Sequence, residues 1–215
     1  MFPPATEQRL RDYAALLHTW TRRINLVSAA DQPNIWSRHV LDSLRLAPLL
    51  PAGTERGIDL GSGAGFPGLV LAIATGIPFD LIESDQRKAA FLREAARLTA
   101  APVTIHTTRI EDTPIPPAPV VTARALAPLD KLLPMAARHL AAGGTMIFPK
   151  GTRAAEEVAA ARRLWTFRLA IEGGASPILL IRDPAPIPAQ AQAQARHADA
   201  LHTDALHTDA SHTND

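Results

Sequence analysis

Hydrophobic positions recur with a helical period in the first part of the chain. Between residues 6 and 24 the apolar side chains lie three or four positions apart, at Leu10, Tyr13, Leu17, Trp20 and Ile24, which is typical of an amphipathic helix. A second apolar face begins after Asp31 and continues to Pro48, so a second helix is expected there. Together these two segments predict a helical cap over residues 1–50.

Short apolar runs alternate with helical patterns in the middle of the chain. The runs that predict strands are 57–60, 79–83, 103–106, 120–122, 145–148, 165–170 and 178–181. Helical patterns cover 67–75, 86–99, 128–140 and 153–164. Gly143-Gly144 is expected to stop the third of these helices. This alternation predicts an α/β domain over residues 51–182, with a seven-stranded, mostly parallel sheet covered on both faces.

The composition changes after Arg182. A proline-rich stretch is followed by alternating glutamine and alanine, and Asp-Ala-Leu-His-Thr then repeats from Asp199. The repeat carries too little apolar surface to offset the entropy cost of ordering, so residues 183–215 are expected to be a disordered tail. The repeated histidines are His202, His207 and His212. A spacing of five would spread them around a helix, so no metal site is expected.

Composition and charge narrow the function classes. The chain has no cysteine, which excludes disulfides, thiolate metal sites and thiol nucleophiles. No apolar stretch approaches the roughly 20 residues of a membrane span, and residues 1–5 carry no signal-peptide pattern, so a cytoplasmic protein without a membrane partner is expected. Residues 1–182 hold 21 basic and 16 acidic residues, and most of the basic ones are arginine, which permits a phosphate-rich partner.

The segment from Gly57 to Gly68, Gly-Ile-Asp-Leu-Gly-Ser-Gly-Ala-Gly-Phe-Pro-Gly, predicts a nucleotide-binding loop between a strand and a helix. Its second half satisfies the G-x-G-x-x-G pattern of dinucleotide-binding folds. Glu83 ends the next strand, where its carboxylate can accept hydrogen bonds from ribose hydroxyls. Asp59 favours S-adenosylmethionine, because its carboxylate would attract a cationic amino group and repel a pyrophosphate. Both cofactor classes stay open at this point.

Four further places carry candidate chemistry. Arg38 and His39 lie on the second predicted helix and either face a substrate or belong to a salt-bridged surface. Ile110-Glu111 follows the third strand, where it can contact an adenine or form a solvated turn. Arg124 ends the fourth strand, where it can reach a cofactor or a substrate phosphate, or pair with an internal acid. Lys150 ends the fifth strand on the same side and suits a phosphate or base contact.

These motifs occur in an order that resembles one family. The motifs are Asn25-Leu-Val, Arg38-His-Val-Leu-Asp-Ser, Asp59-Leu-Gly-Ser-Gly-Ala-Gly-Phe-Pro-Gly, Glu83-Ser, Arg87-Lys, Phe91-Leu, Thr122-Ala-Arg-Ala and Lys150-Gly. The set, over about residues 8–182, is similar to the bacterial 16S ribosomal RNA guanine-N7 methyltransferases, also called glucose-inhibited division protein B. Many relatives have Asp where this chain has Glu83.

The resemblance implies a Rossmann-like class I methyltransferase fold with S-adenosylmethionine as cofactor. It implies cofactor-binding roles for a set of positions: Gly61, Phe66, Ile110, Glu111 and Arg124. From the loop pattern we add Asp59, Gly63, Gly65 and Glu83 to this set. Arg124, Lys150, Arg38 and His39 are the candidates for holding RNA or aligning the base.

The expected chemistry suits these residues. Guanine N7 presents a lone pair, so no general base is needed and positioning suffices. The chain lacks the cysteine of pyrimidine C5 methylation and the Asp-Pro-Pro-Tyr or Asn-Pro-Pro-Tyr motif of exocyclic amine methylation. The hypothesis is a monomeric enzyme that methylates one guanine in the decoding-centre loop of 16S RNA, as free RNA or in the small ribosomal subunit. A small-molecule methyltransferase, a nicotinamide-dependent oxidoreductase and a nucleotide sensor are the alternatives.

Overall fold

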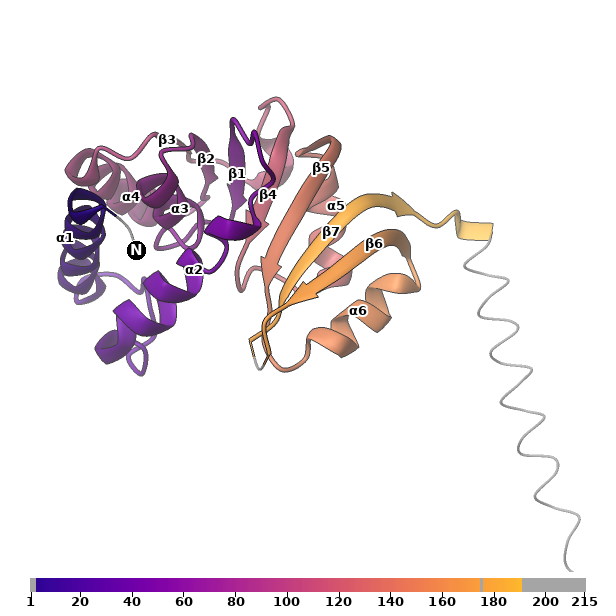
Figure 1. The fold of residues 1–215 in the computed structure, drawn as a ribbon, viewed down its shortest axis with the longest axis horizontal. Helices are drawn as coiled ribbons and strands as arrows, with labels where there is room; N and C mark the ends of the chain where they lie inside the picture. The colour runs from indigo at the N-terminus through magenta and orange to yellow at the C-terminus, as the bar shows by residue number, and fades with distance from the viewer. Residues whose placement is uncertain (1–2, 175, 191–215) are drawn as a thin grey trace, which may run out of the picture.

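A computed structural model describes residues 3–174 and 176–190, which form one sheet with helices on both of its faces (Figure 1). The strands are β1 (Gly57–Leu60), β2 (Phe79–Ile82), β3 (Val103–His106), β4 (Ala118–Ala123), β5 (Leu140–Pro149), β6 (Trp165–Glu172) and β7 (Ile178–Pro186). Their order is β3-β2-β1-β4-β5-β7-β6. The β7 strand runs antiparallel to its neighbours β5 and β6, and the other pairs are parallel. The predicted seven-stranded, mostly parallel sheet is confirmed.

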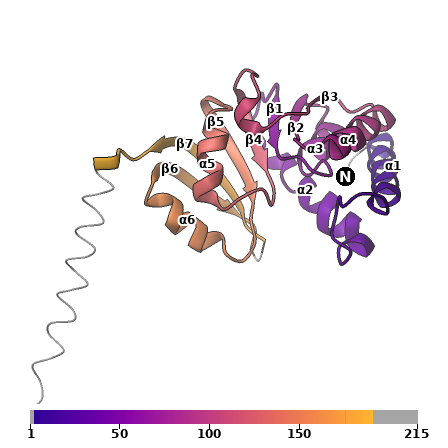
Figure 2. The ribbon, with the colours of Figure 1, turned by 180° about the vertical axis from the view of Figure 1, so that it is seen from behind.

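The helices divide the apolar core into two clusters, one on each face of the sheet. The helices of the first face are α1 (Pro4–Thr21), α3 (Gly68–Thr75) and α4 (Gln86–Thr99). Those of the second are α5 (Leu129–Ala137) and α6 (Ala154–Arg162), which Figure 2 shows from behind, in front of the β4–β6 half of the sheet. Successive residues of β1 point to opposite faces of the sheet, and Ile58 and Leu60 point to the face of the second cluster.

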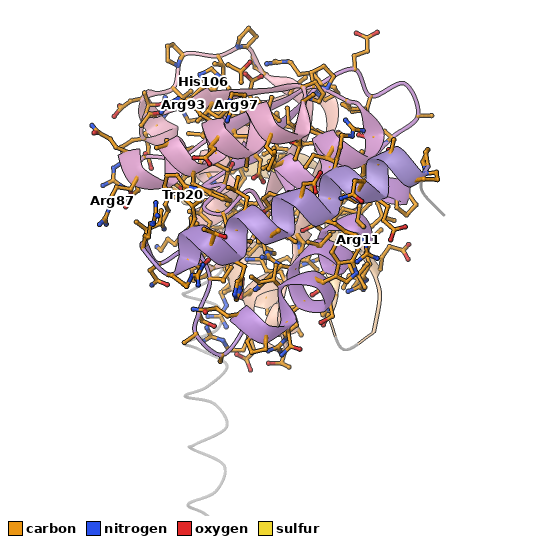
Figure 3. All side chains as sticks on the ribbon, turned by 90° about the vertical axis from the view of Figure 1, so that its left-hand side faces the viewer. Arg11, Trp20, Arg87, Arg93, Arg97 and His106 are labelled. Carbon is orange, nitrogen blue, oxygen red and sulfur yellow. The ribbon has the colours of Figure 1, made fainter. Side chains whose placement is uncertain are left out.

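The first predicted helix forms and is part of the domain core. Tyr13 is fully buried, and its hydroxyl donates to the Ala64 carbonyl of the glycine loop at 2.5 Å. Trp20 packs edge-on against Phe91 of α4, with ring centroids 5.8 Å apart. Figure 3 looks onto this side, with Trp20 between α1 and α4 and the arginines Arg93 and Arg97 on the outer side of α4. The cap therefore supports the loop directly.

The second predicted helix forms without a break from residue 32 to residue 44, but it is not a regular α-helix. The chain instead forms the 3-10 helix η1 (Gln32–Asn34), the π-helix η2 (Trp36–Leu41), one turn of α2 (Asp42–Leu44) and the 3-10 helix η3 (Ala47–Leu49). Pro33 and Pro48 lie in the first turns of η1 and η3, the helix position that proline favours. The wider turn of η2 is a feature often found at functional sites.

Two predicted boundaries also change. The α5 helix ends at Ala137, before Gly143-Gly144, so the prediction that these glycines stop a helix is wrong. They lie inside β5, where the register with β4 shifts between Ala118 and Val120, and glycine is a residue that such irregularities favour. At the other end β7 continues to Pro186, which pairs with β6. Residues 183–186 therefore belong to the sheet, and most of the predicted tail lies outside the described residues.

Within the residues that the structure describes, none of the helices is long and apolar enough to cross a membrane.

Candidate functional site

The loop between β1 and α3 turns sharply at glycines. Gly61, Gly63 and Gly65 have φ angles of +63°, +55° and +97°. At Gly61 a Cβ would lie 2.7 Å from Leu126 Cδ1, at a φ that side chains rarely tolerate. The loop can therefore pass close to the end of β4 only because position 61 has no side chain.

Glu83, at the end of β2, ties this loop to α4. Its Oε2 accepts a hydrogen bond from the Gly63 N–H, and its Oε1 accepts one from the Asp85 N–H, both at 2.8 Å. Asp85 in turn caps α4, since its Oδ1 accepts from the N–H groups of Arg87 and Lys88 at 2.8 and 3.2 Å. Each carboxylate oxygen of Glu83 retains a lone pair, so the predicted bonds to ribose hydroxyls are compatible with these contacts.

Asp59 lies fully buried on β1, beneath the loop. Thr122 donates to its Oδ1 at 2.7 Å, whereas its Oδ2 has no hydrogen-bond partner in the described part of the chain. Gly68 packs against it so closely that a Cβ on Gly68 would lie 2.5 Å from Asp59 Cβ. Burial raises the pKa of Asp59 to about 6, although the Thr122 hydrogen bond lowers it. A buried carboxylate with one unpartnered oxygen favours a cation nearby, and the charge of Arg124 already lowers its pKa.

A cavity of about 340 Å³ opens beside the glycine loop, and we call it the loop cavity. Five of the predicted cofactor-binding residues line it: Gly61, Gly63, Glu83, Ile110 and Glu111. It lies at the carboxyl ends of β1, β2 and β3, where open α/β sheets bind ligands. The structure thus brings together positions that are far apart in the sequence.

A second cavity of about 450 Å³ lies next to it, and we call it the outer cavity. Its lining includes the predicted residues Arg124 and Lys150. Ala125 and Leu126 line both cavities, so the two meet at the end of β4. Ala125 has a φ of +53°. Positive φ at a residue with a side chain is uncommon and concentrates at functional sites.

Three of the predicted cofactor-binding residues line neither cavity: Asp59, Gly65 and Phe66. Phe66 is buried below Arg124, whose guanidinium lies 4.7 Å from the centroid of its ring. Gly65 is buried, and a Cβ there would lie 2.8 Å from the Leu69 Cβ. These residues support the cavity walls, and their contacts with a cofactor stay predictions.

The cations predicted to hold RNA are already engaged within the protein. Lys150 Nζ lies 2.8 Å from Glu157 Oε2 and donates to the Ala127 carbonyl at 3.0 Å. Arg38 donates to Asp31 Oδ1 at 3.0 Å. The Lys150–Glu157 pair lies in the wall of the outer cavity, whereas neither Arg38 nor Asp31 lines either cavity.

The sequence interpretation missed several lining residues. In the loop cavity they include Lys88, Thr108 and Arg109, and in the outer cavity they include Arg45 and Arg153. Arg109 and Thr108 follow β3, and position after a strand's carboxyl end is the signal that could have found them. Lys88 and Arg153 lie in or next to helix starts, where nothing in the local sequence separates a lining residue from a surface one.

No cluster of histidine and acidic side chains suitable for a metal ion occurs among residues 3–174 and 176–190. The repeated histidines of the predicted tail lie outside the described residues.

Comparison with known proteins gives the family. The model of a family described as "GidB: rRNA small subunit methyltransferase G" matches residues 6–174. The chain belongs to this family. The ribosomal RNA small subunit methyltransferase G of Rhodospirillum centenum is 56% identical over 165 residues, which cover 76% of each chain. The enzyme of the same name from Paramagnetospirillum magneticum is 55% identical over 160 residues, 74% of this chain and 78% of the relative. The resemblance drawn from the motifs is confirmed.

Solved structures with the same fold include proteins bound to AdoMet or to SAH. The protein described as M. jannaschii TYW2 in complex with AdoMet has a TM-score of 0.53 at 16% identity, covering 71% of this chain and 78% of its own. An O-methyltransferase from Bacillus cereus in complex with SAH has a TM-score of 0.52 at 12% identity, covering 85% and 92%. At these identities the likeness shows the class I methyltransferase fold alone. Because the chain belongs to the rRNA small subunit methyltransferase G family, a nicotinamide-dependent oxidoreductase is no longer an alternative interpretation.

Proposed function

We propose that this protein transfers a methyl group from S-adenosylmethionine to N7 of one guanine in the decoding-centre loop of 16S ribosomal RNA. The observation that carries the proposal is the pair of adjoining cavities that meet at Ala125 and Leu126. A methyl donor and an acceptor base need two such sites with one shared wall. Membership of the rRNA small subunit methyltransferase G family supplies the kind of acceptor.

The residues of the loop cavity fit S-adenosylmethionine. Glu83 would hold the ribose hydroxyls, and Ile110 and Glu111 would hold the adenine. The unpaired oxygen of Asp59 offers a negative charge beneath the loop, which suits a ligand with an ammonium and a sulfonium group. When bound, this cofactor supplies an electrophilic methyl group on sulfur.

Methylation of guanine N7 requires the protein mainly to position the base. N7 of guanine has a lone pair and no proton to remove, so no side chain has to act as a base. The protein's task is to hold the base edge in line with the methyl group and to exclude water. Arg124 and Ala125 directly follow β4 where the cavities meet, so this segment would align the two ligands.

The charges left over after internal pairing indicate where RNA phosphates would bind. Arg153, Lys88 and Arg109 line the cavities, and none of their side chains has a hydrogen bond or ion pair within residues 3–174 and 176–190. The charge of Lys150 is already paired with that of Glu157. We therefore assign the phosphate contacts to these three free cations before Lys150 and Arg38. The enzyme would act as a monomer in the cytoplasm, where small subunits are found.

The test is methyl transfer from labelled cofactor to small subunits purified from cells that lack this enzyme, with the free 16S RNA assayed in parallel. We expect label at N7 of a single guanine, mapped by chemical cleavage of the RNA at 7-methylguanine. Subunits from cells that contain the enzyme serve as the control and should accept no label. Absence of label from both substrates, with cofactor binding intact, would contradict the proposal.

The RNA contacts have a matched test. A triple variant of Lys88→Gln, Arg109→Gln and Arg153→Gln should bind RNA more weakly, with a shallower dependence on salt, because three phosphate contacts are lost. Arg163→Gln, an exposed cation that lines neither cavity, is the control and should change neither quantity. An unchanged salt slope in the triple variant would assign the RNA to another surface.

A further inference from the structure

His39 contacts Arg124 and lines neither of the two cavities. Its Nδ1 lies 2.8 Å from Arg124 Nη2, and its side chain is only 13% exposed. The imidazole also stacks on Phe66, with ring centroids 5.1 Å apart and an interplanar angle of 29°. A residue that follows Arg38 on a surface helix thus turns inward, toward a side chain 85 positions later.

Arg124 is held from three directions. Its Nη2 donates to His39, its Nη1 donates to the Arg38 carbonyl at 3.4 Å, and its guanidinium lies over the Phe66 ring. The Arg38 carbonyl belongs to η2, the π-helix that replaces the predicted regular helix. The irregular backbone of this segment therefore positions both acceptors.

The contact between the two side chains defines the protonation state of His39. A guanidinium can only donate hydrogen bonds, so Nδ1 must accept and cannot carry a proton. The proton of the neutral ring is then on Nε2, which faces Asp31 Oδ2 at 3.9 Å. Burial and the charge of Arg124 lower the pKa of His39, while Asp31 and Asp42 oppose this effect and Arg38 adds to it. The neutral ring is therefore the form at neutral pH.

We propose that His39 is a positioning residue that acts through Arg124, its unprotonated Nδ1 holding the guanidinium at the wall of the outer cavity. The proposal rests on the proposed function, because it assigns the arginine a role in aligning cofactor and acceptor. It gives His39 a task other than direct contact with RNA. Its value to the enzyme is the fixed direction of a long, otherwise adaptable side chain.

Two variants separate the hydrogen bond from the packing. His39→Asn keeps an acceptor, Oδ1, at the place of Nδ1 but removes the ring. His39→Phe keeps a ring on Phe66 but has no acceptor. We expect His39→Phe to lose about tenfold or more in kcat/KM, the loss typical of a hydrogen bond to a charged group, and His39→Asn to stay within about threefold of the wild type. The opposite order would show a packing role and overturn the proposal.

The pH profile supplies a readout that packing does not move. As pH falls through the pKa of His39, Nδ1 gains a proton and can no longer accept, so the wild type should lose activity relative to His39→Asn. Asp59 titrates near this range but is present in both proteins, as are Arg38, Asp31, Asp42 and Arg124, so the ratio of the two profiles isolates His39. A ratio that stays flat from pH 8 down to the lowest pH at which both proteins remain folded would contradict the proposal.

Controls keep the result interpretable. His18→Asn changes an exposed histidine of α1 and should leave both kcat/KM and the profile unchanged. If His39→Phe does not fold, as judged by thermal unfolding, His39→Met fills the space without a comparable acceptor and carries the same prediction. Calorimetry with S-adenosylmethionine distinguishes the two hypotheses: failure of the wild type to bind it contradicts the proposed function, whereas equal activity of wild type and His39→Phe contradicts only the role of His39.

Discussion

Two aspartates on neighbouring strands have opposite surroundings. Asp59 of β1 and Asp80 of β2 lie on opposite faces of the sheet, because Asp59 is in register with Leu81 whereas Ile58 is in register with Asp80. Both are acidic residues in short apolar strands. Asp59 has one oxygen without a partner, whereas both oxygens of Asp80 are paired.

Asp80 is the centre of a closed electrostatic cluster. Its Oδ2 accepts from Arg56 at 2.6 Å and its Oδ1 lies 2.7 Å from His106 Nε2. Arg56 also donates to the carbonyls of Pro116 and Pro117 at 2.5 and 2.9 Å. The cluster connects the segment before β1 with β2, β3 and the loop before β4. A fully paired acid of this kind stabilises the fold, and an unpaired one at the carboxyl end of a strand marks a place for a ligand.

The largest effect is expected from Asp80→Ala. It leaves Arg56 and His106 without their carboxylate, so the free energy of unfolding should fall by about 3 kcal/mol, at the lower end of the range for buried ion pairs, because the cluster is only partly buried and Arg56 keeps its carbonyl partners. Urea unfolding measures this change, with the exposed Asp112→Ala as control. A stability equal to that of the wild type would show that the cluster contributes nothing.

Asp59→Asn is expected to raise the free energy of unfolding at alkaline pH, opposite to the effect of Asp80→Ala. The folded-state pKa of Asp59 is about 6 against an ordinary value of 3.8, so the native protein binds this proton more tightly than the unfolded chain does. Wild-type stability therefore falls as pH rises from about 4 through 6. Asparagine does not titrate, so the variant should be more stable at pH 8 by up to about 3 kcal/mol, with the difference gone below pH 4. Urea unfolding at pH 4, 6 and 8 measures it, and a less stable variant at pH 8 would be the contrary result.

Cofactor affinity sharpens the comparison further. Asp59→Asn should weaken the binding of S-adenosylmethionine about tenfold at pH 8, because it removes a negative charge close to a cationic ligand. Asp80→Ala should leave the affinity unchanged at a temperature where the variant is folded. Calorimetry measures the affinity of both variants for S-adenosylmethionine. An equal loss of affinity in the two would contradict the assignment of Asp59 to a ligand site and of Asp80 to a structural cluster.

The smallest effect, on cofactor affinity, is expected from Thr122→Val. This change removes the hydrogen bond to Asp59 Oδ1, which should raise the pKa of Asp59 further and leave more of it neutral at pH 7. Cofactor affinity should fall roughly threefold at pH 7 and recover by pH 9, where the carboxylate is again ionised. Titrations at the two pH values measure this, and a loss that persists at pH 9 would assign Thr122 a steric role.

Most of the regular elements could be predicted because their patterns are local. The strand at Gly57–Leu60 and the helix at Gln86–Thr99 have the predicted bounds, since an apolar run before glycines and a capped amphipathic period each determine the nearby backbone. The prediction for residues 32–49 missed the irregular helix types, because the apolar spacing of this segment is compatible with several of them. Its π-helix contains Arg38 and His39, both of which contact Arg124 from a distant part of the chain.

The amino-acid sequence by itself determined the glycine loop, Glu83 at the end of the next strand and the motif order typical of the family, because each depends on neighbours along the chain. Only the tertiary structure decided that Lys150 is neutralised by Glu157 and that His39 contacts Arg124. It also decided that Asp59 has one oxygen without a partner, whereas both oxygens of Asp80 are paired. Such pairings depend on strand register and on the packing of distant segments. The same residue types can therefore bind, position or stabilise, and burial together with the available partners decides which of these they do.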